Sequence, residues 1–444
     1  MSILNKIIKY KYLIIFVVVF VTSISIVVVL VRNYELYVDK MEVSSYQYEW
    51  LQTYGYDGVD KGFGIDQDSE MNIYISGFQD GAGPLCLLKY NSNGSLLWNR
   101  TWGHGEAYDL VIDDMDNIYI TGHNSAIFLL KLNSSGHVLL NKTWMSTKYV
   151  VGNAIDIDDL GNIYITGYSA GIGQDNNIGF LLKCNATGDL EWNQTFGLMF
   201  SEGFDVKVTD FGGILVTGYL QVSEQNWDLC LLKYNSTGNL EWTSTWGESV
   251  DECGRAIAVD SSGNIYITGY KRKSLNNNDL CLISYNSSGD LRWTKIWGGD
   301  EDDFGLDITL DNSGLIYIVG ATGSFRENTN IDDILLVKFD KQGNCVSFKT
   351  WGEYSGTDYG FGLVLDNQGF VYLTGTMIVG YNHFVDIFLL KYDLAKFPID
   401  FSIPGYNVIY FCIISSFFSV ILVTFVNTKA KHIIFHRKCQ SNRQ

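Results

Sequence analysis

Residues 255–298 read RAIAVDSSGNIYITGYKRKSLNNNDLCLISYNSSGDLRWTKIWG and contain four short apolar or alternating runs. The runs lie at 256–259, 265–268, 280–285 and 291–297, and each has the length of a β-strand. The turn sequence DSSGN separates the first two runs, and NSSG separates the last two. The stretch therefore predicts four antiparallel strands, A to D, that follow one another as a meander.

The same unit recurs along the chain. The glycine that closes strand B returns at steps of 45, 45, 51, 51, 51 and 55 residues, as Gly77, Gly122, Gly167, Gly218, Gly269, Gly320 and Gly375. A period of four short strands in this range is typical of the blades of a β-propeller. Seven glycines therefore predict seven blades.

The two ends of the repeat array predict a closed ring. Each of the first six repeats ends strand D with an aromatic residue, but the seventh has no such strand after Leu389. Residues 50–55 (WLQTYG) match the strand D sequence at 242–247 (WTSTWG) and precede any strand A. We expect this N-terminal strand to complete the last blade, because closure leaves no open sheet edge.

The composition agrees with such a fold and limits the partners. The chain has 444 residues, of which 46% are hydrophobic and 14% aromatic, with 45 glycines and three prolines. This mixture suits many short strands joined by glycine turns. The formal net charge of −18 argues against nucleic acid as a partner.

Apolar stretches flank the repeats. Residues 12–31 carry no charge and are long enough to cross a bilayer as a helix. We predict an uncleaved transmembrane anchor there, with a removed signal peptide as the alternative. A second transmembrane helix is predicted near the C-terminus, with a helix buried against the propeller as the alternative. Basic residues near both ends place both termini in the cytoplasm and the propeller outside the cell, at the cell membrane.

The predicted domains are a cytoplasmic N-terminus (1–11), a transmembrane signal anchor (12–32), a tether (33–45), an all-β seven-bladed propeller of four-stranded antiparallel blades (46–397), a tether (398–407), a transmembrane helix (408–427) and a basic cytoplasmic tail (428–444). Both tethers join the last blade on the face of the A–B and C–D turns. We expect that face to point toward the membrane and the D–A and B–C loops to point away from it.

The loops on the outward face vary most. The distance from the strand B glycine to the apolar pair of strand C ranges from 7 to 16 residues. Variable loops on a rigid frame are typical of binding surfaces. We therefore predict a non-catalytic binding or adhesion scaffold for a protein or carbohydrate ligand. A solvated acidic rim is the alternative for the carboxylates. The candidate ligand-binding residues are Asp60, Trp227, Glu252, Asp303, Phe325, Asp358 and Tyr381.

One turn is similar to part of a calcium loop. Asp156, Asp158 and Asp159 are closely spaced before Gly161 and could supply hard oxygen ligands to Ca²⁺. The distal glutamate of an EF-hand is absent, and an aspartate that caps a turn before glycine explains the pattern equally well. Apart from this possible Ca²⁺, no cofactor is predicted. The sequence holds no Gly-x-Ser-x-Gly, His-Glu-x-x-His or phosphate-loop motif, so no residue pattern supports an enzyme.

Asn-x-Ser/Thr sequences mark candidate glycosylation sites on an extracellular domain. Some of these sequences are also good turns, so turn formation is the alternative explanation for them. The candidates are Asn99, Asn141, Asn193, Asn235 and Asn286.

The recurrent frame Trp-Gly, Asp-x-Gly, Asp-x-x-Gly-Asn-Ile-Tyr-Ile-Thr-Gly-Tyr and Asp-x-x-Leu-x-Lys resembles the SBBP family of seven-bladed β-propeller repeats. The resemblance is visible at 252–271 and 303–320 and extends over about 50–393. It implies a propeller with surface or secreted placement, and it carries no catalytic motif to transfer. The chain lacks the proline-rich B–C segment common in that family.

Two other functions stay open. One is a structural role in the cell envelope through lateral assembly. The other is a propeller enzyme of the quinoprotein-like or polysaccharide-processing kind. The sequence NSTGNLEW at 235–242 resembles the Gly-x-x-x-Trp frame of quinoprotein propellers, although those enzymes generally have eight blades.

Overall fold

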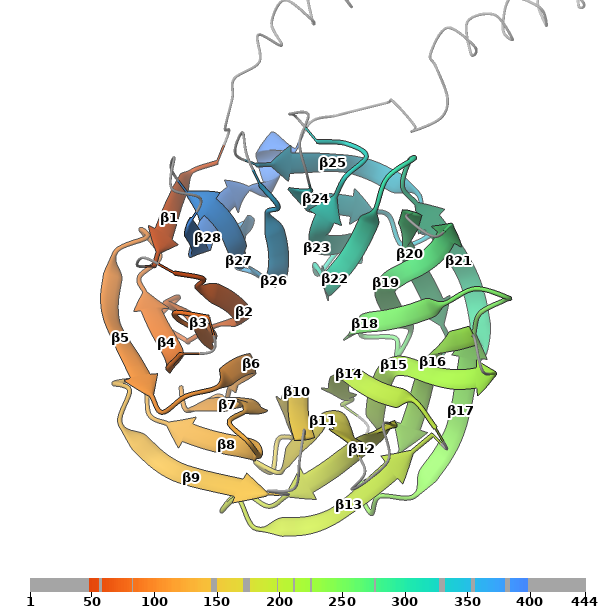
Figure 1. The fold of residues 1–444 in the computed structure, drawn as a ribbon, viewed down its shortest axis with the longest axis horizontal. Helices are drawn as coiled ribbons and strands as arrows, with labels where there is room; N and C mark the ends of the chain where they lie inside the picture. Colours follow the sequence, from red (N-terminus) through yellow and green to blue (C-terminus); the bar gives the residue numbers. More distant parts are fainter. Residues whose placement is uncertain are drawn as a thin grey trace, which may run out of the picture. The chain divides into compact units, whose positions relative to one another are not determined.

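A computed structural model describes residues 48–397 with gaps at 56–57, 82, 145–149, 171–175, 198, 211, 224–225, 275–276, 327–331, 353–355 and 380–383. Within these residues the strands form seven four-stranded antiparallel sheets, arranged as blades around a central axis (Figure 1). The predicted all-β propeller is thus confirmed for this part of the chain.

The predicted helices at 12–32 and 408–427, with their tethers and cytoplasmic ends, lie outside the described residues. No helix in the described part of the chain is long and apolar enough to cross a membrane.

Four strands make each blade, and the innermost surround the axis (Figure 1). The innermost strands are β2 (Lys61–Gln67), β6 (Glu106–Ile112), β10 (Val150–Ile157), β14 (Ser201–Val208), β18 (Glu252–Val259), β22 (Asp303–Leu310) and β26 (Tyr359–Leu365). The second strands are β3 (Ile73–Phe78), β7 (Ile118–His123), β11 (Ile163–Ala170), β15 (Ile214–Ser223), β19 (Ile265–Ser274), β23 (Ile316–Thr322) and β27 (Phe370–Val379). The third strands are β4 (Leu85–Tyr90), β8 (Ile127–Leu132), β12 (Asn177–Cys184), β16 (Asn226–Tyr234), β20 (Asn277–Tyr285), β24 (Asp333–Phe339) and β28 (Phe384–Asp393). The outermost strands are β5 (Leu96–Trp102), β9 (Val138–Trp144), β13 (Leu190–Phe196), β17 (Leu240–Trp246), β21 (Leu291–Trp297), β25 (Cys345–Trp351) and β1 (Trp50–Tyr54). Blade 1 begins at β2, and blade 7 consists of β26, β27, β28 and β1.

The N-terminal strand closes the ring as predicted. β1 pairs antiparallel with β28, with Trp50 opposite Lys391 and Tyr54 opposite Ile387. The short helix η1 (Leu394–Lys396) follows β28, and Lys396 forms an ion pair with Glu49 just before β1. Both ends of the described chain therefore meet at one edge of blade 7 (Figure 1).

Each strand B glycine allows two backbones to approach closely. A Cβ atom on Gly269 would lie 1.9 Å from the carbonyl oxygen of Cys253 on β18, and the six equivalent glycines give 1.8 or 1.9 Å. Beside this contact the innermost strand carries a β-bulge, here between Gly254 and Ala256. The glycine recurs because any side chain would collide with the neighbouring strand.

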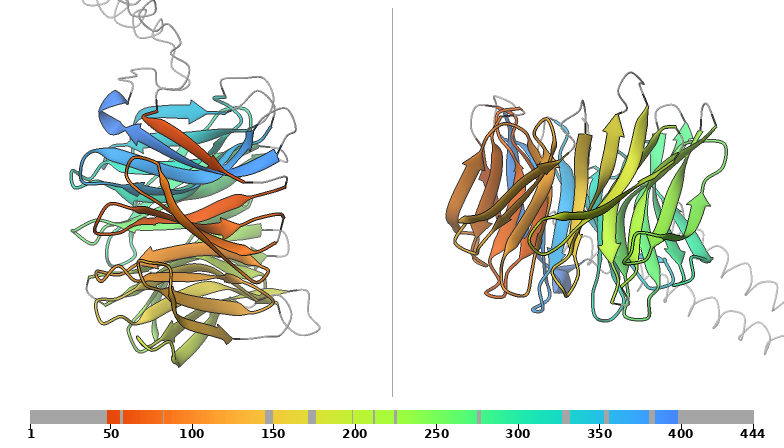
Figure 2. Two further views of the ribbon diagram at one scale, coloured as in Figure 1. Left: turned by 90° about the vertical axis from the view of Figure 1, so that its left-hand side faces the viewer. Right: turned by 90° about the horizontal axis from the view of Figure 1, so that it is seen from below.

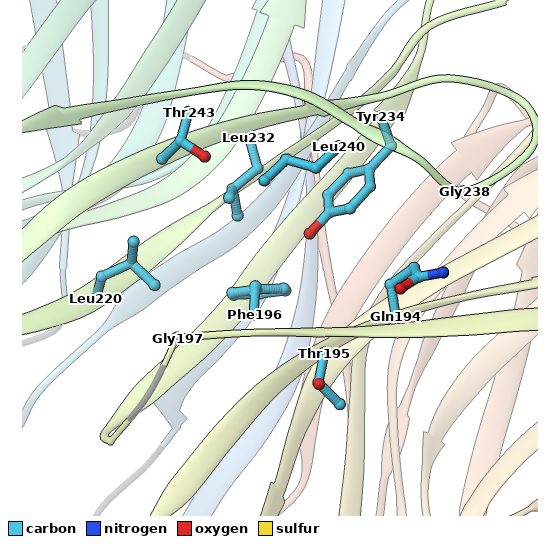
Figure 3. A pocket seen from close by; sticks show the side chains of 10 residues that line it. All are labelled: Gln194, Thr195, Phe196, Gly197, Leu220, Leu232, Tyr234, Gly238, Leu240 and Thr243. Carbon is cyan, nitrogen blue, oxygen red and sulfur yellow. The ribbon is translucent and has the colours of Figure 1, made fainter.

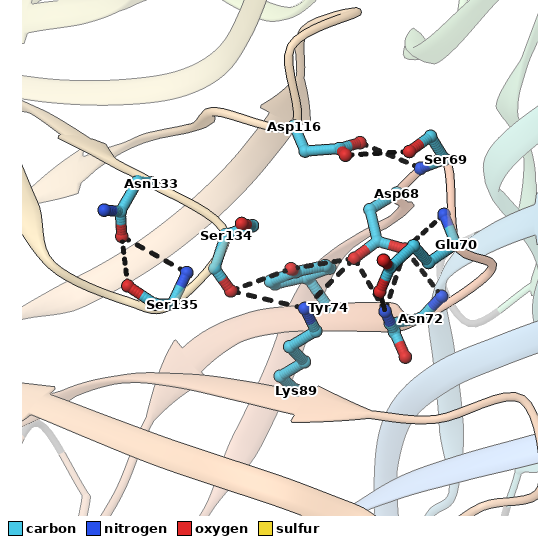
Figure 4. A network of polar contacts seen from close by, with 10 residues as sticks. All are labelled: Asp68, Ser69, Glu70, Asn72, Tyr74, Lys89, Asp116, Asn133, Ser134 and Ser135. Atoms are coloured by element: carbon cyan, nitrogen blue, oxygen red, sulfur yellow. Dashed lines mark hydrogen bonds and ion pairs between the residues drawn. The ribbon is translucent and has the colours of Figure 1, made fainter.

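Six of the seven A–B turns are held by an aspartate, and Figure 4 shows Asp68 in the turn of blade 1. Asp68 accepts from the backbone N–H of Asn72 (2.8 Å) and from the Tyr74 hydroxyl (3.0 Å). Lys89 Nζ lies 3.1 Å from Asp68 Oδ2 and also donates to the Ser134 carbonyl of blade 2 (3.2 Å). The turn, the buried Tyr74 and the strand C residue Lys89 thus form one hydrogen-bonded network that extends to blade 2.

The apolar core lies between neighbouring blades. One cluster joins Leu85 and Leu87 of blade 1 to Ile120 and Phe128 of blade 2. Comparable clusters join the other neighbouring blades, including blade 7 to blade 1. Figure 2 shows the blades edge-on, with the strands running between the two faces of the ring.

Replacing Gly269 with alanine should destabilise the ring. The new methyl group would meet the Cys253 carbonyl, and such overpacking costs about 3 kcal/mol. Urea unfolding followed by circular dichroism measures the loss. Ser274→Ala, at the exposed end of the same strand, is the matched control and should be neutral. Equal stability of the Gly269→Ala variant and the wild type would contradict this role of the glycine.

Closure is tested at Thr53, an exposed residue in the middle of β1 that faces Phe388. Thr53→Pro places a residue with a fixed φ and no backbone N–H in the only sheet ladder that joins the two ends of the described chain, so the thermal midpoint should fall. Thr53→Val preserves the ladder. It should change the free energy of unfolding by no more than about 0.5 kcal/mol and leave the thermal midpoint nearly unchanged. Unchanged melting of Thr53→Pro would show that β1 contributes little to closure.

Candidate functional site

The four predicted acidic residues lie inside the ring. Asp60, Glu252, Asp303 and Asp358 each have 0% exposure. Asp60 accepts from the Asp80 N–H (3.1 Å), and Asp358 accepts from the Ile378 N–H (2.7 Å). The D–A loops end at these positions, where backbone donors need acceptors. Their burial argues against the solvated acidic rim that was the alternative explanation for these carboxylates.

The predicted aromatic residues lie apart. Trp227 is partly buried and stacks on Tyr219, with ring centroids 5.5 Å apart. Phe325 instead covers Trp297 of blade 5 (4.7 Å between centroids) and contacts Phe348. Tyr381 lies outside the described residues. Of the two described aromatic residues, Trp227 has the surroundings of a binding residue.

The three aspartates of the predicted calcium loop face different partners. Asp158 holds its own turn through the N–H of Asn162 (2.8 Å), whereas Asp156 accepts from Val208 N–H of blade 4 (2.7 Å). Asp159 is exposed. In the described part of the chain no group of three His, Cys, Asp or Glu side chains could hold a metal ion. Turn formation therefore accounts for Asp158.

The candidate glycosylation residues divide into two groups. Asn99, Asn141 and Asn193 are exposed on the outermost strands. Asn235 and Asn286 are partly buried, because each uses its side-chain oxygen to close a C–D turn.

A set of seven residues that the sequence analysis missed lies on the innermost strands. Each stands fourteen residues before a strand B glycine, and each lies within the β-bulge of its innermost strand. All seven are partly exposed. We call this set the inner rim, and it consists of Phe63, Tyr108, Asn153, Phe204, Arg255, Leu306 and Phe361.

A bulge turns the extra side chain away from the regular alternation of a strand. The contacts between blades show where these side chains meet. Phe63 packs against Tyr108 on one side and Phe361 on the other, with centroids 5.2 and 5.1 Å apart. The guanidinium carbon of Arg255 lies 3.9 Å from the ring centroid of Phe204. The inner rim thus carries two aromatic groups near the loop end of the axis.

Polar groups adjoin the aromatic ones. Glu202 accepts from Asn153 Nδ2 (3.1 Å) and from the Tyr219 hydroxyl (3.2 Å). Burial raises the pKa of Glu202, while these hydrogen bonds and the charge of Arg255 act in the opposite direction. Aromatic faces for stacking and fixed polar groups for hydrogen bonding therefore lie side by side.

Further along the axis, carboxylates link the innermost strands. Asp109 accepts from Ile155 N–H (2.9 Å), Asp205 from Ile257 N–H (2.7 Å) and Asp307 from Leu363 N–H (2.9 Å), each in the next blade. Asp66 and Asp156 stand two residues further along their innermost strands and accept in the same way from Ile112 N–H and Val208 N–H of the next blade. We call these five residues the axial carboxylates: Asp66, Asp109, Asp156, Asp205 and Asp307.

Lys207 stands among the axial carboxylates, with Nζ 3.2 Å from Asp156 Oδ2. Burial raises the pKa of Asp66 to about 6, of Asp205 to about 7 and of Asp307 to about 6. Nearby aspartates raise the pKa of Asp205 further, and Lys207 lowers it. The axis therefore holds negative charge that one lysine partly offsets.

A separate pocket lies between blades 3 and 4, away from the inner rim (Figure 3). Phe196, Leu220, Leu232 and Leu240 line it together with Tyr234. Phe196 ends β13 at the position where the other outermost strands end in Trp or Tyr. The smaller ring explains the space, and the mainly apolar lining makes it a packing defect between blades.

The axial carboxylates should make stability depend on pH. The raised pKa values of Asp66, Asp205 and Asp307 mean that the folded chain binds more protons than the unfolded chain between about pH 4 and pH 7. The free energy of unfolding should therefore fall as the pH rises from about 4 to about 7. Urea unfolding at about pH 5 and pH 7.5 measures this fall. Greater stability at pH 7.5 would contradict it.

The Lys207→Met variant measures how much the lysine among the axial carboxylates contributes to stability. Loss of the ammonium group should cost about 1–2 kcal/mol at pH 7.5, a modest value because the lysine side chain is 45% exposed. The cost should shrink at pH 5, where the carboxylates are more protonated. Lys142→Met, which breaks an exposed ion pair with Asp189, is the control and should show no such pH dependence.

One comparison with a solved structure supports the propeller fold. The WD40 beta-propeller domain of Doa1 is similar, with a TM-score of 0.52 and 12% identity over 78% of this chain and 97% of that one. A protein of unknown function from Bacteroides caccae has a TM-score of 0.41 and 13% identity, over 66% of this chain and 94% of that one. A protein of unknown function from Dyadobacter fermentans has a TM-score of 0.47 and 10% identity, over 78% of this chain and 98% of that one.

At these identities the likeness concerns the fold alone. No curated protein matches the sequence. Residues 254–270 match the family model described as the SBBP Beta-propeller repeat. These residues span β18 and the start of β19, so the resemblance to the SBBP repeat is confirmed within blade 5 of a seven-bladed propeller.

Proposed function

We propose that the protein is a membrane-anchored, extracellular binding scaffold without catalytic activity, whose protein or carbohydrate ligand contacts the inner rim and the loops around it. The observation that carries this proposal is the inner rim itself. One repeat position supplies seven partly exposed side chains, and four of them are aromatic.

The frame of the rim is rigid while its side chains differ. Phe, Tyr, Asn, Arg and Leu all occur at this one position, between small or acidic neighbours that vary little. A rigid closed sheet holds each side chain in place before a ligand arrives, which lowers the entropic cost of binding. Variation at a fixed position is therefore better explained by ligand recognition than by packing.

The chemistry of the rim suits a ligand with both apolar and polar faces. Trp227 and Tyr219 present stacked rings, and Glu202, Asn153 and Arg255 provide acceptors and donors nearby. Sugar rings and peptide side chains both bind to such combinations of stacking and hydrogen bonding.

The anchored part of the proposal rests on the two apolar stretches and on where the ring begins and ends. Glu49 and Lys396 form an ion pair, so both ends of the propeller leave it at one edge. That edge belongs to the face of the A–B and C–D turns. Two membrane helices attached there would leave the inner rim and the D–A and B–C loops facing away from the bilayer.

The binding proposal is tested with the full chain in lipid nanodiscs, probed with an array of oligosaccharides and a library of extracellular peptides. Phe204→Ala combined with Trp227→Ala should weaken the strongest interaction at least about tenfold, or about 1.4 kcal/mol, because both stacking surfaces are lost.

Leu291→Ala is the matched control, because this leucine is 52% exposed on the outermost strand of blade 5. It should leave binding unchanged. Equal binding by the rim variant and the control, with both folded, would contradict the placement of the ligand at the inner rim.

A further inference from the structure

Three of the seven blade interfaces in the described chain bring two carboxylates from neighbouring blades together, and a fourth has acids at the same two positions. The first acid lies on strand C and pairs with the residue two positions after the strand B glycine of its own blade. The second acid belongs to the next blade and lies 17 residues before the strand B glycine of that blade. The pairs are Asp228 with Glu252, Asp279 with Asp303, Asp333 with Asp358, and Asp386 with Asp60.

The two acids occur together or not at all. At the other three interfaces the same two positions hold Pro84 with Gly105, Ala126 with Val150, and Ile178 with Ser201. Two carboxylates brought together repel each other unless a positive group lies near them or one of them is protonated. This pattern therefore indicates a shared partner for each pair.

A glycine makes room at the meeting point. A Cβ on Gly298 would lie 2.5 Å from Asp279 Oδ1 and 2.7 Å from Asp303 Oδ2, so both oxygens point at one place. Gly247 and Gly55 stand in the same way between their acids. Gly103 precedes an interface without the acids, and a Cβ there would meet nothing within 4 Å.

The interface between blades 5 and 6 shows an independent sign of a ligand. Asn277 is 7% exposed, and its side-chain oxygen has no hydrogen-bond partner in the described chain. Its Nδ2 donates to the Gly299 carbonyl (3.2 Å), which places the amide beside Gly298. Asp279 Oδ1 is also buried without a hydrogen-bond partner among the described residues. Buried oxygens of this kind normally have partners.

We propose that a divalent cation of the Ca²⁺ type binds between blades 5 and 6, with Asp279, Asp303 and the Asn277 oxygen as ligands. These are hard oxygen donors from three positions, and Ca²⁺ accepts six to eight such ligands, including backbone carbonyls and water. The site differs from the calcium loop predicted at Asp156, Asp158 and Asp159. It joins two blades, so the ion would strengthen the ring close to the loop face.

Lys273 is the rival occupant. Its Nζ lies 3.4 Å from Asp279 Oδ2 and 2.7 Å from the Gly299 oxygen. The lysine side chain is 50% exposed, so a bound ion would displace the ammonium group into solvent at little cost. If Lys273 alone neutralised the acids, its removal would destabilise the ring whether or not Ca²⁺ is present.

The experiment compares the thermal midpoint of the full chain in nanodiscs with EDTA and with added CaCl₂. Ca²⁺ should raise the midpoint of the wild type and of Lys273→Met, and Asp279→Asn should reduce that rise. No effect of Ca²⁺ on the wild type or on Lys273→Met, with Lys273→Met less stable in both buffers, would overturn the proposal in favour of the lysine.

Terbium luminescence gives a second readout, because Trp297 directly precedes Gly298 and can sensitise a bound Tb³⁺ ion. Excitation of tryptophan should produce Tb³⁺ emission that Ca²⁺ competes away. Asp279→Asn should lower this emission, whereas Asp159→Asn, an exposed turn aspartate, should not. Loss of emission in Asp159→Asn but not in Asp279→Asn would overturn the proposed location.

Discussion

The contact between each strand B glycine and the backbone of the innermost strand shapes every blade. The carbonyl oxygen of that strand occupies the space that a Cβ would need, and the strand bulges beside it. The bulge gives one extra residue, and that residue joins the inner rim. A constraint on the backbone thus fixes both the repeat of the fold and the position of its most varied side chains.

Closure turns these local contacts into a single body. β1 pairs with β28, and each axial carboxylate accepts a backbone N–H from the next blade. Such bonds partly offset the cost of placing acidic groups close together around one axis, because a carboxylate is stabilised by donors aimed at it. Strong interaction between blades therefore allows a concentration of negative charge that a single sheet would not tolerate.

The sequence predicted the fold far better than the site. The spacing of glycines and the WLQTYG segment were enough for blade number and closure, because strand period and pairing leave local patterns. Asp60 and Glu252 were expected as ligand-binding residues at the loop face, yet Asp60 directly precedes β2, Glu252 begins β18, and both are buried. Burial there depends on the neighbouring blade. The inner rim has a constant spacing in the sequence, but its residue types differ, so no chemical motif marks it.

The acid pairs show why departures from the repeat matter most. Asp279 and Asp303 belong to different repeats, so their meeting follows only from the packing of blade 5 against blade 6. The three interfaces from blade 1 to blade 4 share the same backbone but lack the acid pair. The backbone of a blade therefore forms without the acid pairs, and a function other than folding has to explain why they are present. The same reasoning applies to Arg255 and Asn153 on the inner rim. The repeated backbone of the blades does not need these two side chains, so they are available for binding a ligand.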